Sequence, residues 1–140
     1  MTAAGTTPIF GLTPKTQGTT FVNADGTGLK TIYTAGTAGA RVLAVNATSD
    51  DTAACDVNLY VQVGGAGTAY NIGGKRVPIA AGKVVASTIA STQLLDAAQI
   101  PTLLSDGSLQ LGASDVLQAG VVAAVTAAKT LTLVVQAIDY

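Results

Sequence analysis

The 140-residue sequence contains no histidine and no glutamate, and its single cysteine is Cys55. The usual general bases are therefore missing, so a Ser-His-Asp or Cys-His site cannot be built within the chain. One thiol without an imidazole also cannot supply the four ligands of a tetrahedral zinc site. We expect a protein that is not an enzyme and has no catalytic, cofactor-binding or metal site. Cys55 is interpreted as a small hydrophobic residue near the start of a strand.

Charged residues are also scarce, at 11% of the chain, against about 25% in an ordinary soluble domain. The net charge of -1 provides no basic excess to neutralise phosphates, so a nucleic-acid partner is not expected. Hydrophobic residues make up 49%, which excludes the composition of a disordered chain. The polar surface must then consist of Thr, Ser, Asn and Gln. Such a surface either has no partner or is covered in an assembly, and we favour the assembly.

The sequence shows neither the pattern of a secretory signal peptide nor that of a membrane-spanning helix. The first residues lack a basic segment followed by an apolar run, so no secretory signal peptide is recognised. The most apolar windows, such as residues 119–128, fall well short of the roughly 20 residues that a membrane-spanning helix needs. We therefore expect no membrane partner, and we expect synthesis and assembly in a cytoplasm.

The stretch 41–72 shows the clearest secondary-structure pattern. Residues 56–63 alternate strictly, with Val57, Leu59, Val61 and Val63 predicted to face the core. The glycine-rich residues 64–67 permit a reversal into a second strand at 68–72. Pairing Val63 with Thr68 would place Val61 opposite Tyr70 and Leu59 opposite Ile72. Upstream, the same period predicts a strand in which Leu43, Val45 and Ala47 face the core. Val42 and Ala44 make its opposite face nearly as apolar, as in a strand central to a sheet.

Further short strands follow at a spacing typical of an all-β domain. They are predicted at residues 19–22, 29–33, 75–79, 83–87, 109–111, 116–125 and 130–138. In the last of these, Leu131, Leu133, Val135 and Ala137 are predicted to face inward. One short helical segment is predicted at residues 91–99, just before Pro101. Because the strands do not alternate with helices, we expect an antiparallel β-sandwich formed by residues 19–140.

Residues 1–18 show neither the two-residue period of a strand nor the period of a helix. They contain Pro8 and Pro14, which favour extended backbone. They are predicted to form an extended N-terminal arm. The arm either frays or packs on its own domain, as chain ends usually do, or it lies on a neighbouring subunit through its apolar cluster. In the second case the interface residues would be Ile9, Phe10 and Leu12.

Five other residues are candidates for interfaces. Tyr60 alternates with the core-facing residues of its predicted strand, so it should point outward. It is either an ordinary exposed tyrosine or a contact residue, since tyrosine is enriched at interfaces. Lys75 and Arg76, with Lys83 nearby, form a small basic spot that is either solvated or a docking site for an acidic partner. Val134 and Ile138 lie on the outward side of the last strand and favour self-association.

Three aspartates beside one turn could surround a cation, but we interpret them as solvated: Asp50, Asp51 and Asp56.

Four segments carry a family resemblance: Val42-Leu43-Ala44-Val45-Asn46, Asp56-Val57-Asn58-Leu59-Tyr60-Val61, Val77-Pro78-Ile79-Ala80-Ala81-Gly82 and Leu117-Gln118-Ala119-Gly120. In this order the chain resembles the short β-sandwich virion proteins of tailed bacteriophages, most of all the capsid decoration (cement) proteins. The resemblance spans about residues 41–137 and rests on strand-and-turn patterns.

The resemblance implies a jelly-roll or immunoglobulin-like sandwich that binds the outside of a capsid and stabilises it. The implied partner is the major capsid protein, together with further copies of the chain, for which a trimer is favoured. The implied location is the exterior of the virion. Two other functions are weighed beside this one. A tail or fibre module that binds a host receptor would have the same architecture, whereas an enzyme is disfavoured by the missing acid-base residues.

Overall fold

A computed structural model describes residues 13–83 and 90–140, and its regular structure is almost entirely β-strand. The strands of the described residues are β1 Thr13–Val22, β2 Lys30–Thr34, β3 Ala40–Ser49, β4 Cys55–Gln62, β5 Ala69–Val77, β6 Thr92–Gln93, β7 Leu109–Leu111, β8 Val116–Val121 and β9 Thr130–Asp139. Two single-turn 3-10 helices interrupt them, η1 at Asn23–Asp25 and η2 at Val63–Gly65. No helix of the described residues is long and apolar enough to cross a membrane.

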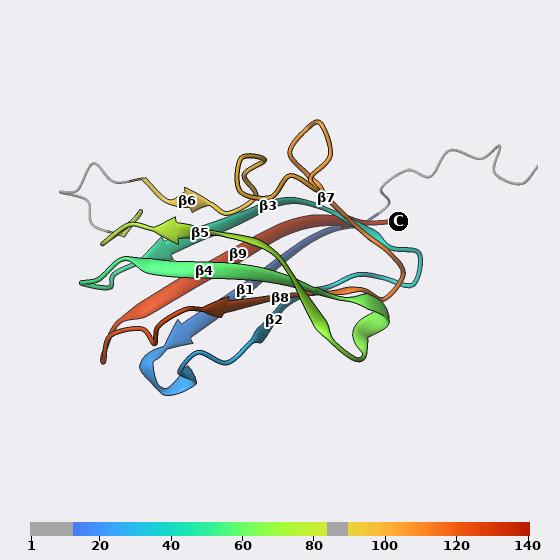
Figure 1. The fold of residues 1–140 in the computed structure, drawn as a ribbon. Coiled ribbons are helices and arrows are strands. Elements are labelled where there is room, and N and C mark those ends of the chain that lie inside the picture. Colours follow the sequence, from blue (N-terminus) through green and yellow to red (C-terminus); the bar gives the residue numbers. More distant parts are fainter. Residues whose placement is uncertain (1–12, 84–89) are drawn as a thin grey trace, which may run out of the picture.

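The strands form two antiparallel sheets that pack face to face (Figure 1). Sheet A has the order β1-β9-β3-β6, and β7 also pairs with β3; sheet B has the order β2-β8-β4-β5. Successive described strands lie in opposite sheets, except for β4 and β5 in sheet B and β6 and β7 in sheet A. If β6 and β7 are taken as one interrupted strand beside β3, this is the eight-strand order of a jelly roll. The predicted antiparallel sandwich is confirmed, with jelly-roll topology.

The core lies between the two sheets and consists mainly of aliphatic side chains. Leu131, Leu133 and Val135 of β9 are fully buried, as the period-two pattern predicted. They face a layer from sheet B that includes Leu59 and Leu117, also fully buried. Burying a side chain of this size contributes roughly 1.5–3 kcal/mol, so this layer provides much of the stability of the fold.

The helical segment predicted at residues 91–99 is wrong. Thr92 and Gln93 instead form β6, and Leu94 donates its backbone N–H to the Val45 carbonyl of β3 at 2.8 Å. A single turn follows, closed by the Ile100 N–H donating to the Asp96 carbonyl at 2.7 Å. Leu94 and Leu95 are adjacent and both buried. Pairing with β3 therefore outweighs the local helical spacing.

Two bulges change the predicted alternation. The register between β3 and β9 shifts between Val42 and Ala44, so Leu43 is 44% exposed, while Val42 and Val45 are fully buried. The prediction that Leu43 faces the core is therefore wrong, and the prediction for Val45 and Ala47 is confirmed. A bulge adds one residue on one strand, which moves the following residues to the opposite face.

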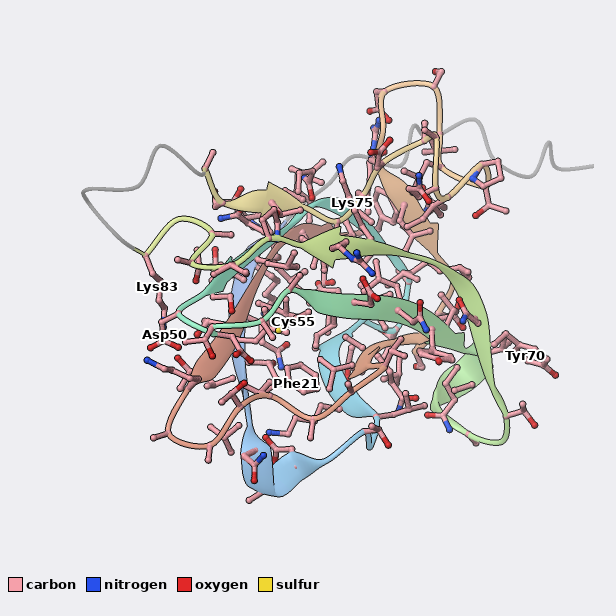
Figure 2. The ribbon with its side chains drawn as sticks, turned by 60° about the vertical axis from the view of Figure 1, so that its left-hand side comes forward. Phe21, Asp50, Cys55, Tyr70, Lys75 and Lys83 are labelled. Atoms are coloured by element: carbon pink, nitrogen blue, oxygen red, sulfur yellow. The ribbon has the colours of Figure 1, made fainter. Side chains whose placement is uncertain are left out.

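The second bulge lies in the β4–β5 hairpin. Val61 is opposite Tyr70, as predicted, but the register shifts beyond Tyr60, so Leu59 lies opposite Gly73 and not Ile72. Tyr70 is exposed and points away from the sandwich near the turn of the hairpin (Figure 2). Val63 is also exposed, because it belongs to η2 and not to the strand.

The structure also changes the predicted boundaries of the N-terminal arm and of the strand at residues 68–72. Strand β1 begins at Thr13 and pairs with β9 along its whole length, so residues 13–18 belong to the sheet and not to an arm. Residues 1–12 lie outside the described residues, as does most of the strand predicted at 83–87. Strand β5 continues through Gly73 and Gly74 as far as Val77.

Candidate functional site

The outer face of sheet A consists of short rows of side chains that run across the strands. One row joins Thr20, Thr132 and Thr48 from β1, β9 and β3. The next joins Gly18, Val134, Asn46 and Gln93, and the one after it joins Thr16, Gln136 and Ala44. The last row joins Pro14, Ile138, Arg41 and Gln110. Residues that lie opposite each other on paired strands are close neighbours. The four rows therefore form one continuous surface in which uncharged polar side chains are mixed with apolar ones.

This surface carries almost no charge. Among the described residues in these four rows, Arg41 is the one that is ionised, and it stands in the end row. Its guanidinium forms an ion pair with Asp106, and its Nε donates to Ser108 Oγ at 2.8 Å. Both partners lie in the loop before β7, so the charge is directed to the edge of the sheet.

A hollow of about 350 Å³ opens in the middle of the face, lined by Ala44, Asn46, Gln93, Val134 and Gln136. Gln93 forms a fixed wall of this hollow, because its Oε1 accepts hydrogen bonds from the backbone N–H groups of Val45 at 2.8 Å and Leu95 at 3.2 Å. The Val45 backbone faces β6, since its carbonyl accepts the Leu94 N–H at 2.8 Å. The Gln93 side chain therefore satisfies a backbone N–H of β3 beside the hollow.

The outer face of sheet B has a different character. Arg76 donates from Nε and Nη2 to the two carboxylate oxygens of Asp56, at 2.7 and 3.0 Å. This bidentate hydrogen bond lowers the pKa of Asp56 and raises that of Arg76. A second hollow of about 550 Å³ lies beside the pair and is lined by Asp56, Val57, Asn58, Gly74, Lys75, Arg76, Gln99 and Val122. Sheet B thus presents an exposed charge pair on its outer face, whereas the three central rows of sheet A contain no ionised side chain.

The basic residues predicted as a docking spot are all engaged within the chain. Lys75 Nζ donates to Asp96 Oδ2 at 2.7 Å, and this hydrogen bond lowers the pKa of Asp96. Lys83 Nζ donates to Thr130 Oγ1 at 2.8 Å. Lys75 and Arg76 are each paired with a carboxylate, whereas Lys83 contacts a neutral hydroxyl. Lys75 and Arg76 as interface residues remain predictions.

The remaining predicted interface residues fall on different surfaces. Tyr60 is half-buried on the outer face of sheet B, where it lies opposite Gln118 and Asn71. Val134 and Ile138 are half-buried on the outer face of sheet A. The structure therefore does not bring the candidates among its described residues into one site. Ile9, Phe10 and Leu12 lie outside the described residues.

A polar cluster beneath the turn after β3 is the feature that the sequence pattern missed. Asp51 is 2% exposed, and its carboxylate accepts from the N–H groups of Ala53 at 3.0 Å and Thr126 at 2.9 Å. The buried Cys55 thiol also donates to it, at 3.6 Å. Burial alone would raise the pKa of Asp51, but the hydrogen bonds, above all those from Thr126, hold the pKa at about 2.

The environment of Cys55 disfavours the thiolate form. Burial, together with the negative charge of Asp51, raises the pKa of the thiol, whereas a nucleophilic cysteine needs a lowered pKa. Asp50 and Lys83 lie on the same side of the molecule as Cys55 (Figure 2). In the described part of the chain, no group of three Cys or Asp residues is arranged to hold a metal ion. The cluster is structural, and Asp51 is not the solvated turn residue that the sequence suggested.

Comparison with solved structures finds this fold in a chain of one bacteriophage capsid structure. A chain in the acidic stable capsid structure of the Helicobacter pylori bacteriophage KHP30 aligns with a TM-score of 0.58 and 14% identity, over 92% of this chain and 90% of that chain. A chain in the capsid asymmetric unit of cyanophage Pam1 aligns at 20% identity over 100% of this chain and 94% of that chain, with a TM-score of only 0.43. No protein-family model and no curated protein matches the sequence. The KHP30 match shows a shared fold.

Proposed function

We propose that the protein is a structural virion protein of a tailed bacteriophage, which decorates the outer surface of the capsid and stabilises it. The observation that carries the proposal is the jelly roll itself, shared over 92% of the chain with a chain of the KHP30 capsid structure. The chemistry of the surface supports it, because a face with so little charge loses little solvation energy when a neighbour covers it. The partner is the major capsid protein, and the location is the exterior of the virion after assembly in the host cytoplasm.

The missing histidine and glutamate, and the aspartates that hydrogen-bond within the chain, agree with a structural function. Stabilisation of a capsid requires only many weak, repeated contacts, since each copy adds its own contribution to the lattice. A standard protein interface buries about 800 Å² on each partner, and one outer face of this sandwich can provide a large part of that area.

Electron microscopy of purified particles tests this proposal directly. We expect density for the sandwich at many symmetry-related positions on the outside of the shell. Particles that lack the protein are expected to lose their genome at lower temperature or lower ionic strength. Density restricted to the tail or to one vertex would contradict decoration and would support a tail or fibre module that binds a receptor.

We further propose that residues 1–12 act as an assembly arm that anchors on a neighbour through Ile9, Phe10 and Leu12. Because β1 begins at Thr13, deletion of residues 2–12 removes none of the strand pairing between described residues. We therefore expect the free energy of unfolding of the isolated protein to change little, while retention on particles falls. A matched control replaces Ile9, Phe10 and Leu12 with serine in the full-length chain and should reproduce the loss of retention. Unchanged retention in both variants would contradict the arm.

A further inference from the structure

The outer face of sheet A is an exposed sheet surface whose chemistry resembles an interface and not a solvated face. Its central rows contain only Thr, Gly, Val, Asn, Gln and Ala, contributed by β1, β9, β3 and β6. Charged residues are depleted at the centres of protein interfaces and enriched on surfaces that remain wet. The outer face of sheet B provides the internal comparison, because it carries the exposed Asp56–Arg76 pair.

The absence of charge points to one kind of partner in particular. In a two-fold contact, each residue near the axis meets the same residue of the other copy, so any charge there would face a like charge. A different protein could be matched by opposite charges, as most surfaces are. A central region without ionised groups therefore removes like-charge repulsion from contact with a second copy, and Arg41, the one charge among the described residues of the rows, lies in the end row.

The face combines large and small side chains around one hollow. Val134 and Gln136 of β9 line this hollow of about 350 Å³. The small residues Gly18 and Ala44 lie opposite them, one on each neighbouring strand. The hollow gives side chains of a second copy a place to insert in an isologous contact.

The size of the face is sufficient for a modest but specific contact. Four strand positions at about 4.8 Å spacing and eight rises of about 3.4 Å give a footprint of roughly 500 Å². Two such faces bury about 1,000 Å² together, which is at the lower limit of a specific interface. The expected association is therefore concentration-dependent.

We propose that the outer face of sheet A packs against the same face of a second copy of this chain, about a two-fold axis. The sheets pack at the usual distance of about 10 Å, with Val134 and Gln136 near the centre. The assembly unit is then a dimer and not the trimer that the sequence analysis favoured. This inference rests on the surface of the isolated chain and is independent of where the protein acts.

A matched pair of variants tests the proposal on the isolated protein. Gln136→Lys places a charge at the centre of sheet A, and Gln118→Lys makes the same change on β8, a central strand of sheet B. Sedimentation equilibrium of the wild type should show the mass rising from 13.8 kDa toward twice that value with concentration. Gln136→Lys should weaken this association at least tenfold, and Gln118→Lys should leave it unchanged. Circular dichroism establishes that both variants fold.

A second measurement needs no variant. Methyl signals of Val134 and Ile138 in nuclear magnetic resonance spectra should shift with concentration, whereas those of the exposed Val122 beside sheet B should not. Wild type that stays monomeric up to millimolar concentration, forms a trimer, or associates equally well with Lys at position 136 would overturn the proposal. If the protein is monomeric and Gln136→Lys instead lowers retention on particles, the face binds the capsid and the second copy is the wrong occupant.

Discussion

Asp51 and Thr126 join the turn after β3 to the loop between β8 and β9, with 2.9 Å between Asp51 Oδ2 and the Thr126 backbone nitrogen. The two residues are 75 positions apart in the sequence. Because Asp51 is buried with its hydrogen bonds satisfied, it fixes two loops at one end of the sandwich. Nearby, the Asp50 carboxylate reinforces this end by accepting the Thr130 N–H at 2.6 Å.

Replacing Asp51 should be costly. Asp51→Ala leaves the backbone N–H groups of Ala53 and Thr126 without their acceptor, and we expect the free energy of unfolding to fall by about 2–4 kcal/mol. Urea denaturation followed by circular dichroism measures this. Thr52→Ala, at the exposed neighbouring position, is the control and should change stability by less than about 0.5 kcal/mol. Similar effects at both positions would contradict the buried network.

The same carboxylate should make stability depend on acid pH. The pKa of Asp51 is about 2 in the folded protein, below its ordinary value of 3.8. A lowered folded pKa contributes stability above the unfolded pKa, and this contribution disappears as the pH falls toward the folded value. We therefore expect the free energy of unfolding to fall between about pH 4 and pH 2. Asp51→Asn should lose less over that range than the wild type, and equal slopes would refute the assignment.

Two leucines provide a matched test of the β3 bulge. Leu59 is fully buried and Leu43 is 44% exposed, although the period-two pattern assigned both to the core. Leu59→Ala should lower the free energy of unfolding by about 2–5 kcal/mol, as large-to-small changes in a core do. Leu43→Ala should cost less than about 1 kcal/mol. Chemical denaturation of both variants decides this, and equal losses would mean that Leu43 is buried after all.

Both the backbone conformation at Gly73 and the close approach of Gln99 require a residue without a side chain. Its φ is +134°, and an added Cβ would lie 2.5 Å from the Gln99 carbonyl oxygen. Gly73→Ala should therefore destabilise the protein by about 1–3 kcal/mol. Gly18, in β1, has open space around its Cβ position, so Gly18→Ala should be neutral or slightly stabilising because alanine lowers the entropy of the unfolded chain. Thermal unfolding of the two variants compares them, and a neutral Gly73→Ala would show that the Gln99 turn can move.

The hydroxyl of Tyr33 should ionise at a higher pH than that of an ordinary tyrosine. Burial, and then its hydrogen bond to the Asp139 carboxylate, raise the pKa of the Tyr33 hydroxyl above its usual value of 10. A raised folded pKa contributes stability below about pH 10, and this contribution is lost as the pH rises further. In an absorbance titration of phenolate, one component should appear only well above pH 10. Tyr33→Phe should remove that component, and its persistence would assign it to another tyrosine.

The class of fold follows from the sequence alone. Strict alternation in residues 57–61 and 131–137 assigned the buried face of β4 and β9 correctly, because side chains of a strand point to opposite faces whatever the strand pairs with. The missing histidine and glutamate limit the chemistry of the chain in any fold that it could adopt. These inferences are local or compositional, so they do not depend on partners that are distant in the sequence.

The positions where the alternation breaks, and the surfaces that form, depend on tertiary pairing. The bulge at Leu43 depends on how β3 pairs with β9, some 90 residues later. The helical spacing near Leu94 lost to hydrogen bonds with β3, and Asp51 became buried because the loop containing Thr126 covers it. The uncharged face of sheet A combines four strands from both ends and the middle of the chain. Such a surface exists only after these strands pair, because pairing makes neighbours of side chains that no sequence window contains together.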